Sequence, residues 1–499
     1  MNVIIKPHHF SGFVRIPASK SHTIRRIFIA ALADGVSEIE HPLDSLHTRS
    51  CVSVCRKLGA EITGYCAPDP LSPNPANEKG EKLLRWTVRG IANGNTPLHT
   101  HNSSGCNAAL RCDAGNSGTT LFLALAAAAL GNKPVEFDGD EQIRRRSAGP
   151  LLDALAGLGV TVKSAPDGCT PITVQGPWKG GRVSLPCPTS QYLSALLLAA
   201  PLAPAGVVTE IDIPLLNEKP YVRMTLSYLD SQNIPYKAAP EPPAAARQDR
   251  ASPPDFSYFS IPGGSVWKPV TGPVPGDFSS AAFLGAAAAI SKGSVTILGL
   301  DPDDTQGDKA FFGFLEKMGC RVRWEQVTGK RIPLGQFIPD GLEATGIQTP
   351  EIQFEEWQLR VSRTGPLRGG EFDLNSTPDL LPPLAAVACF ARGDTAIVNA
   401  AHTRLKETDR IAVMARELGK LGVKITERPD GLIIHGGGPK QFAGGKDRRL
   451  KADGCGDHRV VMALACAALG CPLPVEIAGA ESAANSYPGF LELLGADPA

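Results

Sequence analysis

The chain has 499 residues, too long for one ordinary hydrophobic core, so two large domains or an array of repeats is expected. Hydrophobic residues make up 42% and charged residues 20%, a balance typical of globular proteins rather than extensively disordered ones. The formal net charge is zero, so no global field would attract nucleic acid or an acidic membrane. Any site for anions must therefore come from local clustering of cations.

The N-terminal segment lacks the basic region and long apolar core of a signal peptide. The longest apolar runs, such as Leu121–Leu130, are about half as long as the roughly 20 residues that a membrane span needs. The 12 cysteines include no CxxC pair, which favours reduced thiols over zinc ligation or a disulfide framework. We therefore expect a cytoplasmic globular protein that holds no metal.

One pattern recurs along the chain: a polar motif, a helix rich in Ala and Leu, a Gly stop, and an apolar or β-branched strand. The predicted first helices, in chain order, are Ile24–Ala33, Leu121–Leu130, Leu193–Ala203, Ala281–Ile290, Leu380–Ala391 and Val460–Leu469. Ala-rich helices that end in Gly are common, so a single match would mean nothing. Six matches in order, each with a polar motif at the helix start, favour a true repeat.

A second predicted helix follows in most copies and ends in a step to Gly, which supplies a left-handed residue after the helix. These steps are Leu58-Gly59, Leu158-Gly159, Met318-Gly319, Leu421-Gly422 and Leu494-Gly495. The third copy instead has Ser231-Gln232-Asn233. Segments 64–107, 236–256 and 326–370 have loop composition or weak periodicity and are predicted to be surface loops. The repeat predicts two domains of three α/β units each.

The starts of the predicted first helices carry small and charged residues, where unsatisfied N–H groups and the positive dipole end favour anions. If these ends converge, a cationic cleft forms between the two halves of the chain. The candidate residues are Lys20, Arg25, Asn116–Thr119, Thr189–Gln191, Asp379, His458, Arg459 and the run Arg144–Arg146.

Each candidate also has an ordinary structural interpretation. Three consecutive arginines usually lie on a solvated surface, and Asp before a helix, as at Asp277 and Asp379, usually caps it. The run Asn116–Thr119 could equally be a capped turn, and it is not a phosphate-binding loop because no GxxxxGK[ST] sequence is present.

The run Lys406-Glu407-Thr408-Asp409-Arg410 is predicted to open a helix that continues to Leu418. Lys406 and Arg410 would then face the same side, with Glu407 one step round the helix. Two cations beside a carboxylate suit an anion site with an acid/base group close to it. An ordinary charged helix start is the alternative.

These motifs together resemble the 3-phosphoshikimate 1-carboxyvinyltransferases (EPSP synthases), a branch of the enolpyruvyl transferase family. The matching runs are Ser19-Lys20-Ser21 with Arg25, Gly115-Asn116-Ser117-Gly118-Thr119-Thr120, Ser190-Gln191-Tyr192, Lys219-Pro220-Tyr221, Gly276-Asp277-Phe278-Ser279-Ser280, Pro378-Asp379, Lys406-Glu407-Thr408-Asp409-Arg410 and Asp457-His458-Arg459. The resemblance implies a two-domain inside-out α/β barrel built from six repeated α/β units, three per domain. It places residues 19–274 in an inserted first domain and residues 1–18 plus 275–499 in a second, with the active site in the cleft between them.

The resemblance also implies an activity in aromatic amino-acid (chorismate) biosynthesis. The 5-hydroxyl of shikimate 3-phosphate attacks phosphoenolpyruvate, and phosphate leaves from a tetrahedral intermediate. No metal or organic cofactor is implied, and the expected partners are these two small molecules, with no nucleic acid and no membrane. A monomer is expected.

The resemblance carries site roles onto this sequence. Asp379 would take the proton from the 5-hydroxyl, and Glu407, with Lys20, would transfer protons at the phosphoenolpyruvate methylene. Shikimate 3-phosphate would be held by Lys20, Ser21, Arg25, Thr189, Ser190, Gln191, Asp379 and Lys406. Phosphoenolpyruvate would be held by Lys20, Gly118, Arg146, Gln191, Arg410, Arg459 and Asn485. Six cations and two carboxylates in this set predict a surplus of four positive charges.

The sequence departs from the family pattern at several positions. In each case this chain has a different residue from the one usual in the family: Leu46-His47 in place of an acidic pair, Phe122 of an arginine, Ser147 of a proline, Glu218 of a serine, His402 of an asparagine and Asn485 of a lysine. These departures motivate one alternative, a non-catalytic binding or regulatory relative. A second alternative is a UDP-N-acetylglucosamine enolpyruvyl transferase, but the segment Asp138–Ala148 lacks the reactive cysteine usual there.

Overall fold

The computed structural model describes residues 1–64, 84–91, 109–239, 256–329, 337–339, 354–437 and 449–499. The chain divides into two compact units. Unit 1 comprises Met1–Ser19 and Pro275–Ala499, and unit 2 comprises Lys20–Val274. In the described part of the chain, every helix is too short or too polar to span a membrane.

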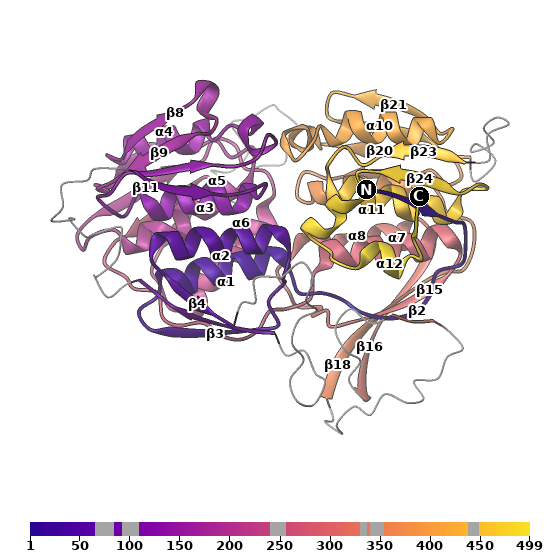
Figure 1. The fold of residues 1–499 in the computed structure, drawn as a ribbon, viewed down its shortest axis with the longest axis horizontal. Helices are drawn as coiled ribbons and strands as arrows, with labels where there is room; N and C mark the ends of the chain where they lie inside the picture. Colours follow the sequence, from indigo (N-terminus) through magenta and orange to yellow (C-terminus); the bar gives the residue numbers. More distant parts are fainter. Residues whose placement is uncertain (65–83, 92–108, 240–255, 330–336, 340–353, 438–448) are drawn as a thin grey trace. The chain divides into compact units, whose positions relative to one another are not determined.

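Unit 2 contains three copies of a βαβαββ repeat, coloured indigo to magenta in Figure 1. Its first copy consists of β14 (Thr271–Pro273), α1 (Lys20–Leu32), β3 (Val36–Glu40), α2 (Leu46–Leu58), β4 (Glu61–Thr63) and β5 (Arg85–Arg89). The second consists of β6 (Leu110–Asp113), α3 (Gly118–Ala128), β7 (Val135–Asp138), α4 (Gly149–Gly157), β8 (Thr161–Ser164) and β9 (Ile172–Gln175). The third consists of β10 (Gly181–Ser184), α5 (Ser190–Ala199), β11 (Val208–Asp212), α6 (Lys219–Ser231), β12 (Lys237–Ala239) and β13 (Tyr258–Pro262).

Unit 1 contains the other three copies. The first consists of β2 (Ser11–Arg15), α7 (Phe278–Ser291), β15 (Ser294–Leu298), α8 (Ala310–Lys317), β16 (Cys320–Gly329) and β18 (Phe354–Arg363), with β17 (Phe337–Pro339) added beside β2. The second consists of β19 (Glu371–Asp373), α9 (Leu381–Ala388), β20 (Asp394–Val398), α10 (Arg410–Lys420), β21 (Lys424–Arg428) and β22 (Gly431–His435). The third consists of β23 (Leu450–Asp453), α11 (His458–Gly470), β24 (Val475–Ala478), α12 (Phe490–Leu493), β25 (Asp497–Pro498) and β1 (Asn2–Ile5).

All six sheets share one strand order. The first two strands of a repeat are parallel, as with β6 and β7, and the fourth strand lies between the second and third in antiparallel pairing. The ends of each unit's chain complete a repeat: β1 pairs with β24 and β25, and β14 pairs with β3. The two segments of unit 1 therefore share a sheet although about 450 residues separate β1 from β23.

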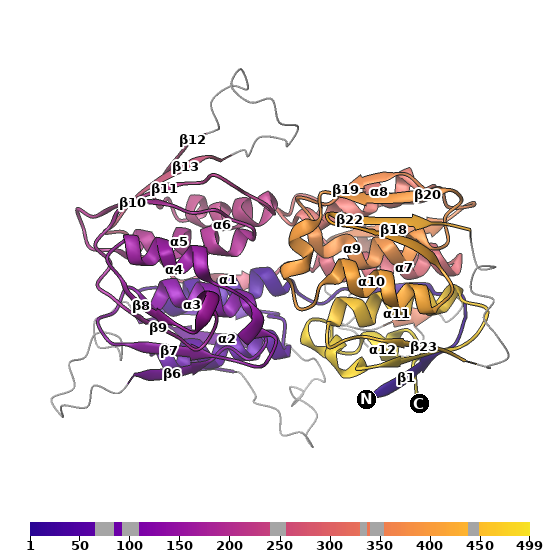
Figure 2. The same cartoon turned by 90° about the horizontal axis from the view of Figure 1, so that it is seen from above.

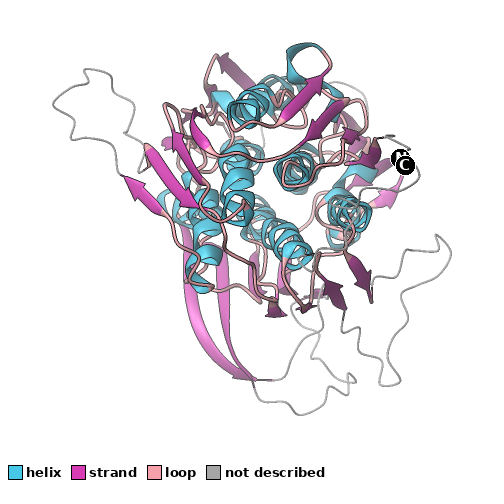
Figure 3. Ribbon diagram, turned by 90° about the vertical axis from the view of Figure 1, so that its left-hand side faces the viewer, coloured by secondary structure: helices cyan, strands magenta, loops and turns pink. Residues whose placement is uncertain are grey.

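The first helix of each repeat lies inside its unit, and the sheets lie outside, as Figures 2 and 3 show. Every residue of α7 is buried, and so are all but the last residue of α11. A helix that is apolar all round has to be covered on every side, and runs of alanine let neighbouring helices approach closely. In unit 1 the helices α7, α9 and α11 pack on one another in a single core. This is the inside-out α/β arrangement that the family resemblance implies.

Helix ends follow the predicted chemistry. Gly59 ends α2 in the left-handed conformation at φ 116°, and the other Gly residues after second helices also have positive φ. In the third copy Asn233 takes the same backbone region at φ 55°, because Asn tolerates it better than most residues with a side chain.

The prediction of three long loops is wrong in part. Segment 64–107 contains β5, which pairs with both β3 and β4, and segment 236–256 begins with β12. Segment 326–370 contains all of β18, which pairs with β16 from Cys320↔Arg363 to Gly329↔Phe354. Within these segments, residues 65–83, 92–107, 240–255, 330–336 and 340–353 lie outside the described residues.

Candidate functional site

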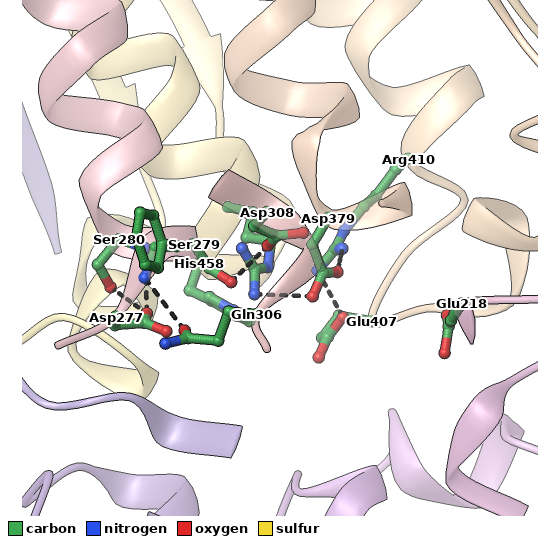
Figure 4. Close-up of polar contacts among 12 residues, drawn as sticks. Glu218, Asp277, Ser279, Ser280, Gln306, Asp308, Asp379, Glu407, Arg410 and His458 are labelled. Carbon is green, nitrogen blue, oxygen red and sulfur yellow. Dashed lines mark hydrogen bonds and ion pairs between the residues drawn. The ribbon is translucent and has the colours of Figure 1, made fainter. Parts of the chain in front are cut away.

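Arg410 is the centre of a buried ionic cluster in unit 1 (Figure 4). Its Nη1 donates to Oδ1 of Asp379 at 2.7 Å, and its Nη2 donates to Oε2 of Glu407 at 2.7 Å. Its Nε donates to Oδ2 of Asp457 at 2.8 Å. Only 1% of the Arg410 side chain is exposed. Burial opposes the charge of Arg410, but the three surrounding carboxylates outweigh it and raise its pKa.

Asp379 joins this cluster to a second guanidinium. Its Oδ2 accepts from Nη2 of Arg459 at 2.8 Å, so each carboxylate oxygen faces a different arginine. Asp379 lies in the 3₁₀ turn η6 (Pro378–Leu380) and makes no cap of the following helix. Asp277, in contrast, accepts from the backbone N–H of Ser280 at 3.0 Å and caps α7. The capping interpretation therefore holds for Asp277 and fails for Asp379.

Residues 406–409 are not helical, which corrects the prediction. Helix α10 begins only at Arg410, because Asp409 caps it by accepting from the N–H of Ala412 at 3.0 Å. Lys406 lies before the helix in extended backbone, after the 3₁₀ turn η7 (Ala401–Leu405). Lys406 and Arg410 thus do not share a helix face. The Glu407–Arg410 pair forms across the bend instead.

Arg404 holds this bend in place. Its guanidinium donates to Asp409 at 2.6 Å and to Glu427 at 2.9 Å. It also donates to the backbone oxygens of Arg428 and Pro429 on the neighbouring strand and turn. The segment that carries Glu407 is therefore anchored by side chains rather than by helical hydrogen bonds.

A further carboxyl group, Asp308, lies fully buried beside this cluster. It lies in η5 (Gly307–Lys309) and accepts a short hydrogen bond from the Ser279 hydroxyl. Burial, with Asp379 as the next cause, raises the pKa of Asp308 from 3.8 to about 7. Arg459 and Ser279 act in the opposite direction. These effects together place the pKa of Asp308 near neutral pH.

In unit 2, Arg25 connects three helices. The guanidinium of this α1 residue donates to Ser194 Oγ of α5 at 3.2 Å and to Thr225 Oγ1 of α6 at 2.9 Å. It also donates to the backbone oxygens of Ser21 and Tyr221 at 3.2 Å each. These four acceptors are neutral, and burial lowers the pKa of Arg25 to about 10. A buried cation whose bonded partners are neutral is typical of an anion site.

The start of α5 is held by Glu218. One carboxylate oxygen, Oε2, accepts from Thr189 Oγ1 at 3.0 Å, from the Ser190 N–H at 3.0 Å and from Ser190 Oγ at 2.8 Å. Only 2% of Glu218 is exposed. Glu218 stands where the family usually has a serine. Its carboxylate thus contacts two of the predicted substrate-binding residues, Thr189 and Ser190.

Gly118, Arg146 and Gln191 also lie together in unit 2. A Cβ atom at Gly118 would lie 2.6 Å from Nη1 of Arg146 and 3.6 Å from Oε1 of Gln191. Gly118 is thus the residue that leaves room for the Arg146 guanidinium. Of the three consecutive arginines, Arg144 and Arg145 form exposed ion pairs with Asp138 and Glu141, so the surface interpretation holds for these two.

The neighbouring turn is a capped turn, as the alternative predicts. Ser117 caps α3 by accepting from the N–H of Thr120 at 3.3 Å. The Asn116 amide bridges Nε2 of His47 at 2.8 Å and Oε1 of Gln142 at 2.7 Å. His47, which stands where the family usually has an acidic pair, therefore makes a structural contact with Asn116.

The remaining predicted residues lie at helix starts and turns. Lys20 and Ser21 begin α1, and Gln191 is the second residue of α5. His402 is buried in η7, and Asn485 is buried at the end of η9 (Ala480–Asn485). Among the other departures, the Phe122 ring meets the Tyr192 ring edge to face, and the Ser147 backbone oxygen accepts from the Tyr192 hydroxyl at 2.6 Å.

Sequence reasoning missed three buried carboxylates. Asp457 and Glu218 lie within or beside matched motifs but received no role, and Asp308 follows Gln306-Gly307 without a recognised signal. Counting Asp457 and Glu218 as ionised reduces the predicted surplus of four positive charges to two, and Asp308 reduces it to one only at a pH above its pKa of about 7. The site residues are more nearly neutralised within the protein than the sequence indicates.

Comparisons with known proteins agree over nearly the whole chain. The family model for EPSP synthase (3-phosphoshikimate 1-carboxyvinyltransferase) matches residues 4–68 and 91–494. A 3-phosphoshikimate 1-carboxyvinyltransferase of Acetivibrio thermocellus is 39% identical over 97% of this chain and 95% of that protein. One of Halobacterium salinarum is 36% identical over 99% of this chain and 98% of that protein.

A solved structure of EPSP synthase from Acinetobacter baumannii has the same fold. It matches with a TM-score of 0.69 and 25% identity, covering 99% of this chain and 97% of that chain. The sequence motifs, the repeated fold and these relatives all lead to one assignment, and the resemblance inferred from the sequence is confirmed. The chain belongs to the EPSP synthase family of transferases.

Proposed function

We propose that this protein transfers the enolpyruvyl group of phosphoenolpyruvate to the 5-hydroxyl of shikimate 3-phosphate and releases inorganic phosphate, a step of chorismate biosynthesis. The observation that carries this proposal is the arrangement around Asp379, a carboxylate oriented by Arg410 and Arg459 rather than used as a helix cap. Such a carboxylate suits the removal of a proton from a hydroxyl group.

Two carboxylates divide the proton transfers in this mechanism. Asp379 takes the proton from the 5-hydroxyl of shikimate 3-phosphate, while the oxygen of that hydroxyl bonds to C2 of phosphoenolpyruvate. Glu407, assisted by Lys20, delivers a proton to the methylene carbon of phosphoenolpyruvate. The resulting tetrahedral intermediate loses the methyl proton and phosphate to give the enolpyruvyl ether. The separate contacts of Asp379 and Glu407 on Arg410 support two distinct roles.

Binding of two phosphorylated carboxylates calls for cations and helix N-termini. We assign shikimate 3-phosphate to Lys20, Ser21, Arg25, Thr189, Ser190, Gln191, Asp379 and Lys406. We assign phosphoenolpyruvate to Lys20, Gly118, Arg146, Gln191, Arg410, Arg459 and Asn485. The cluster of Gly118, Arg146 and Gln191 and the neutral partners of Arg25 support these assignments. Each close cation–anion pair supplies about 4 kcal/mol of gross attraction at an effective dielectric of about 20.

Both units contribute residues to the proposed active site, so we propose that it forms where they close on the substrates. We propose a monomer as the working species. Light scattering of the purified protein would test the monomer.

The test of the proposed function is phosphate release by the purified protein. We expect release when both substrates are present and none above background when either is omitted. A folded protein that releases no phosphate with both substrates would contradict the proposal. Release from phosphoenolpyruvate alone would indicate a phosphatase instead.

A further inference from the structure

Glu218 occupies an unusual position at the start of α6. Its backbone is left-handed, at φ 58° and ψ 38°, a region that residues with a side chain rarely adopt. Its side chain is nearly fully buried and does not cap its own helix. It reaches instead to the turn that begins α5, where Oε2 accepts hydrogen bonds from Thr189 and Ser190.

The three donors that Glu218 uses form an anion site. Two are hydroxyl groups and one is a backbone N–H at a helix N-terminus, a combination that binds phosphate in many proteins. The buried guanidinium of Arg25 is close enough for Glu218 to favour its charged form. The carboxylate of Glu218 is therefore an anion of the protein itself, and it occupies a site that is suited to binding an anion.

We propose that Glu218 is a built-in competitor of the substrate's phosphate group at the Thr189–Ser190 turn. This inference rests on the proposed function, in which that turn holds shikimate 3-phosphate. A phosphate dianion and a carboxylate repel each other at hydrogen-bond range, so Glu218 must leave the turn before the phosphate binds. Glu218 thereby lowers the affinity for the phosphorylated substrate and leaves the affinity for an unphosphorylated ligand nearly unchanged.

Calorimetric titration of the full-length protein tests this competition. Shikimate 3-phosphate is titrated into the wild type, Glu218→Ser and Glu218→Gln, with unphosphorylated shikimate as the second probe. We expect both variants to bind shikimate 3-phosphate at least tenfold more tightly than the wild type, because neither carries the competing charge. The affinity for shikimate should change much less.

The matched control is Glu210→Gln, which removes one carboxylate of the same unit from strand β11, where it accepts a hydrogen bond from Tyr258. This variant should bind shikimate 3-phosphate as the wild type does. Circular dichroism and the melting temperature show whether each variant is folded. Unchanged or weaker binding of shikimate 3-phosphate by folded Glu218→Ser and Glu218→Gln would overturn the inference, and so would an absence of binding by all the proteins.

Phosphate release by the same proteins separates this inference from the proposed function. Tighter binding of shikimate 3-phosphate by the variants without any turnover would refute the proposed reaction and leave the competition intact. Turnover in all proteins, with the same KM for shikimate 3-phosphate, would support the reaction and refute the competition. The expected result is turnover in all proteins and a KM that falls in both Glu218 variants.

Discussion

Asp379 and Asp277 lie at the starts of neighbouring helices in unit 1 and have different partners. Asp277 accepts from the N–H and the hydroxyl of Ser280, which is the ordinary task of a capping residue. Asp379 has two guanidinium partners on different elements, Arg410 and Arg459. Proton transfer should therefore depend on Asp379, while Asp277 should matter to the stability of α7.

Replacing the proposed base tests this distinction. We expect Asp379→Asn to lower kcat by about 10² to 10⁴-fold, because the amide keeps the shape of the side chain but cannot take the proton. Phosphate release in the steady state measures the effect. The exposed residue Glu371 of β19 offers a control in the same repeat, and Glu371→Gln should leave kcat unchanged. An Asp379→Asn enzyme with nearly full activity would refute the assigned role.

Asp308 predicts a dependence of stability on pH. Its folded-state pKa of about 7 is raised from 3.8, first by burial and then by Asp379. The folded state thus holds a proton that the unfolded state releases. The free energy of unfolding should therefore decrease as the pH rises from about 4 to about 7, by up to about 1.4 kcal/mol per pH unit.

Urea unfolding at pH 5 and pH 8 measures this dependence in the wild type and in Asp308→Asn. The asparagine keeps an acceptor for the Ser279 hydroxyl but carries no titrating proton. The variant should therefore lose less stability than the wild type between the two pH values. Equal losses in the two proteins would show that Asp308 does not titrate in this range.

At the scale of the elements, Gly470 at the end of α11 packs against Ile290 of α7 and against Phe390, which follows α9. A Cβ atom on this last residue of α11 would lie 2.5 Å from Phe390 and 2.7 Å from Ile290, both buried side chains. Gly470→Ala should therefore lower the free energy of unfolding by about 1 to 3 kcal/mol, since a close-packed core cannot absorb the added methyl group.

Gly419 provides the opposite case. It lies in the exposed part of α10, where a Cβ atom would meet nothing within 4 Å. Gly419→Ala should raise the free energy of unfolding by about 0.5 to 1 kcal/mol, because alanine has the higher helix propensity. Chemical denaturation measures both variants. An increase for Gly470→Ala would contradict the packing described for Gly470, and a decrease for Gly419→Ala would contradict the open space at Gly419.

The elements also show what the sequence can and cannot predict. Helix starts and Gly stops follow from local chemistry, and Asn233 fits the same rule. The helix predicted from Lys406 fails because Asp409 caps three residues downstream and Arg404 holds the bend through non-local ion pairs. Strand β5 was missed because its pairing with β3 and β4 comes from residues distant in the chain.

Contacts between distant parts of the chain also limited the prediction of the site. Residue types at helix starts indicated most members of the buried clusters, and the family pattern supplied their roles. The partners of these residues depend on packing between repeats, as when Asp457 binds Arg410 from another helix. No local sequence pattern indicates that Asp457, Glu218 and Asp308 reduce the positive charge of the site, the last of them only above its pKa of about 7.

At the scale of the whole molecule, the chain passes from unit 1 into unit 2 near Ser19 and returns near Pro275. Each unit has three complete repeats, because β14 completes the first repeat of unit 2 and β1 completes the last repeat of unit 1. We therefore expect a fragment of residues 20–274 to fold cooperatively by itself.

This fragment should release no phosphate from the two substrates, because Asp379, Glu407, Arg410 and Arg459 all belong to unit 1. Thermal unfolding followed by circular dichroism tests its fold, and the phosphate assay tests its activity. Turnover by the fragment alone would contradict the need for both units.

Identification of the product tests the central claim most directly. The full-length protein is incubated with shikimate 3-phosphate and phosphoenolpyruvate, the organic product is identified by mass spectrometry, and phosphate is measured in the same sample. We predict one enolpyruvyl ether of shikimate 3-phosphate for each phosphate released. Phosphate without the ether, or no reaction by the folded protein, would contradict the account.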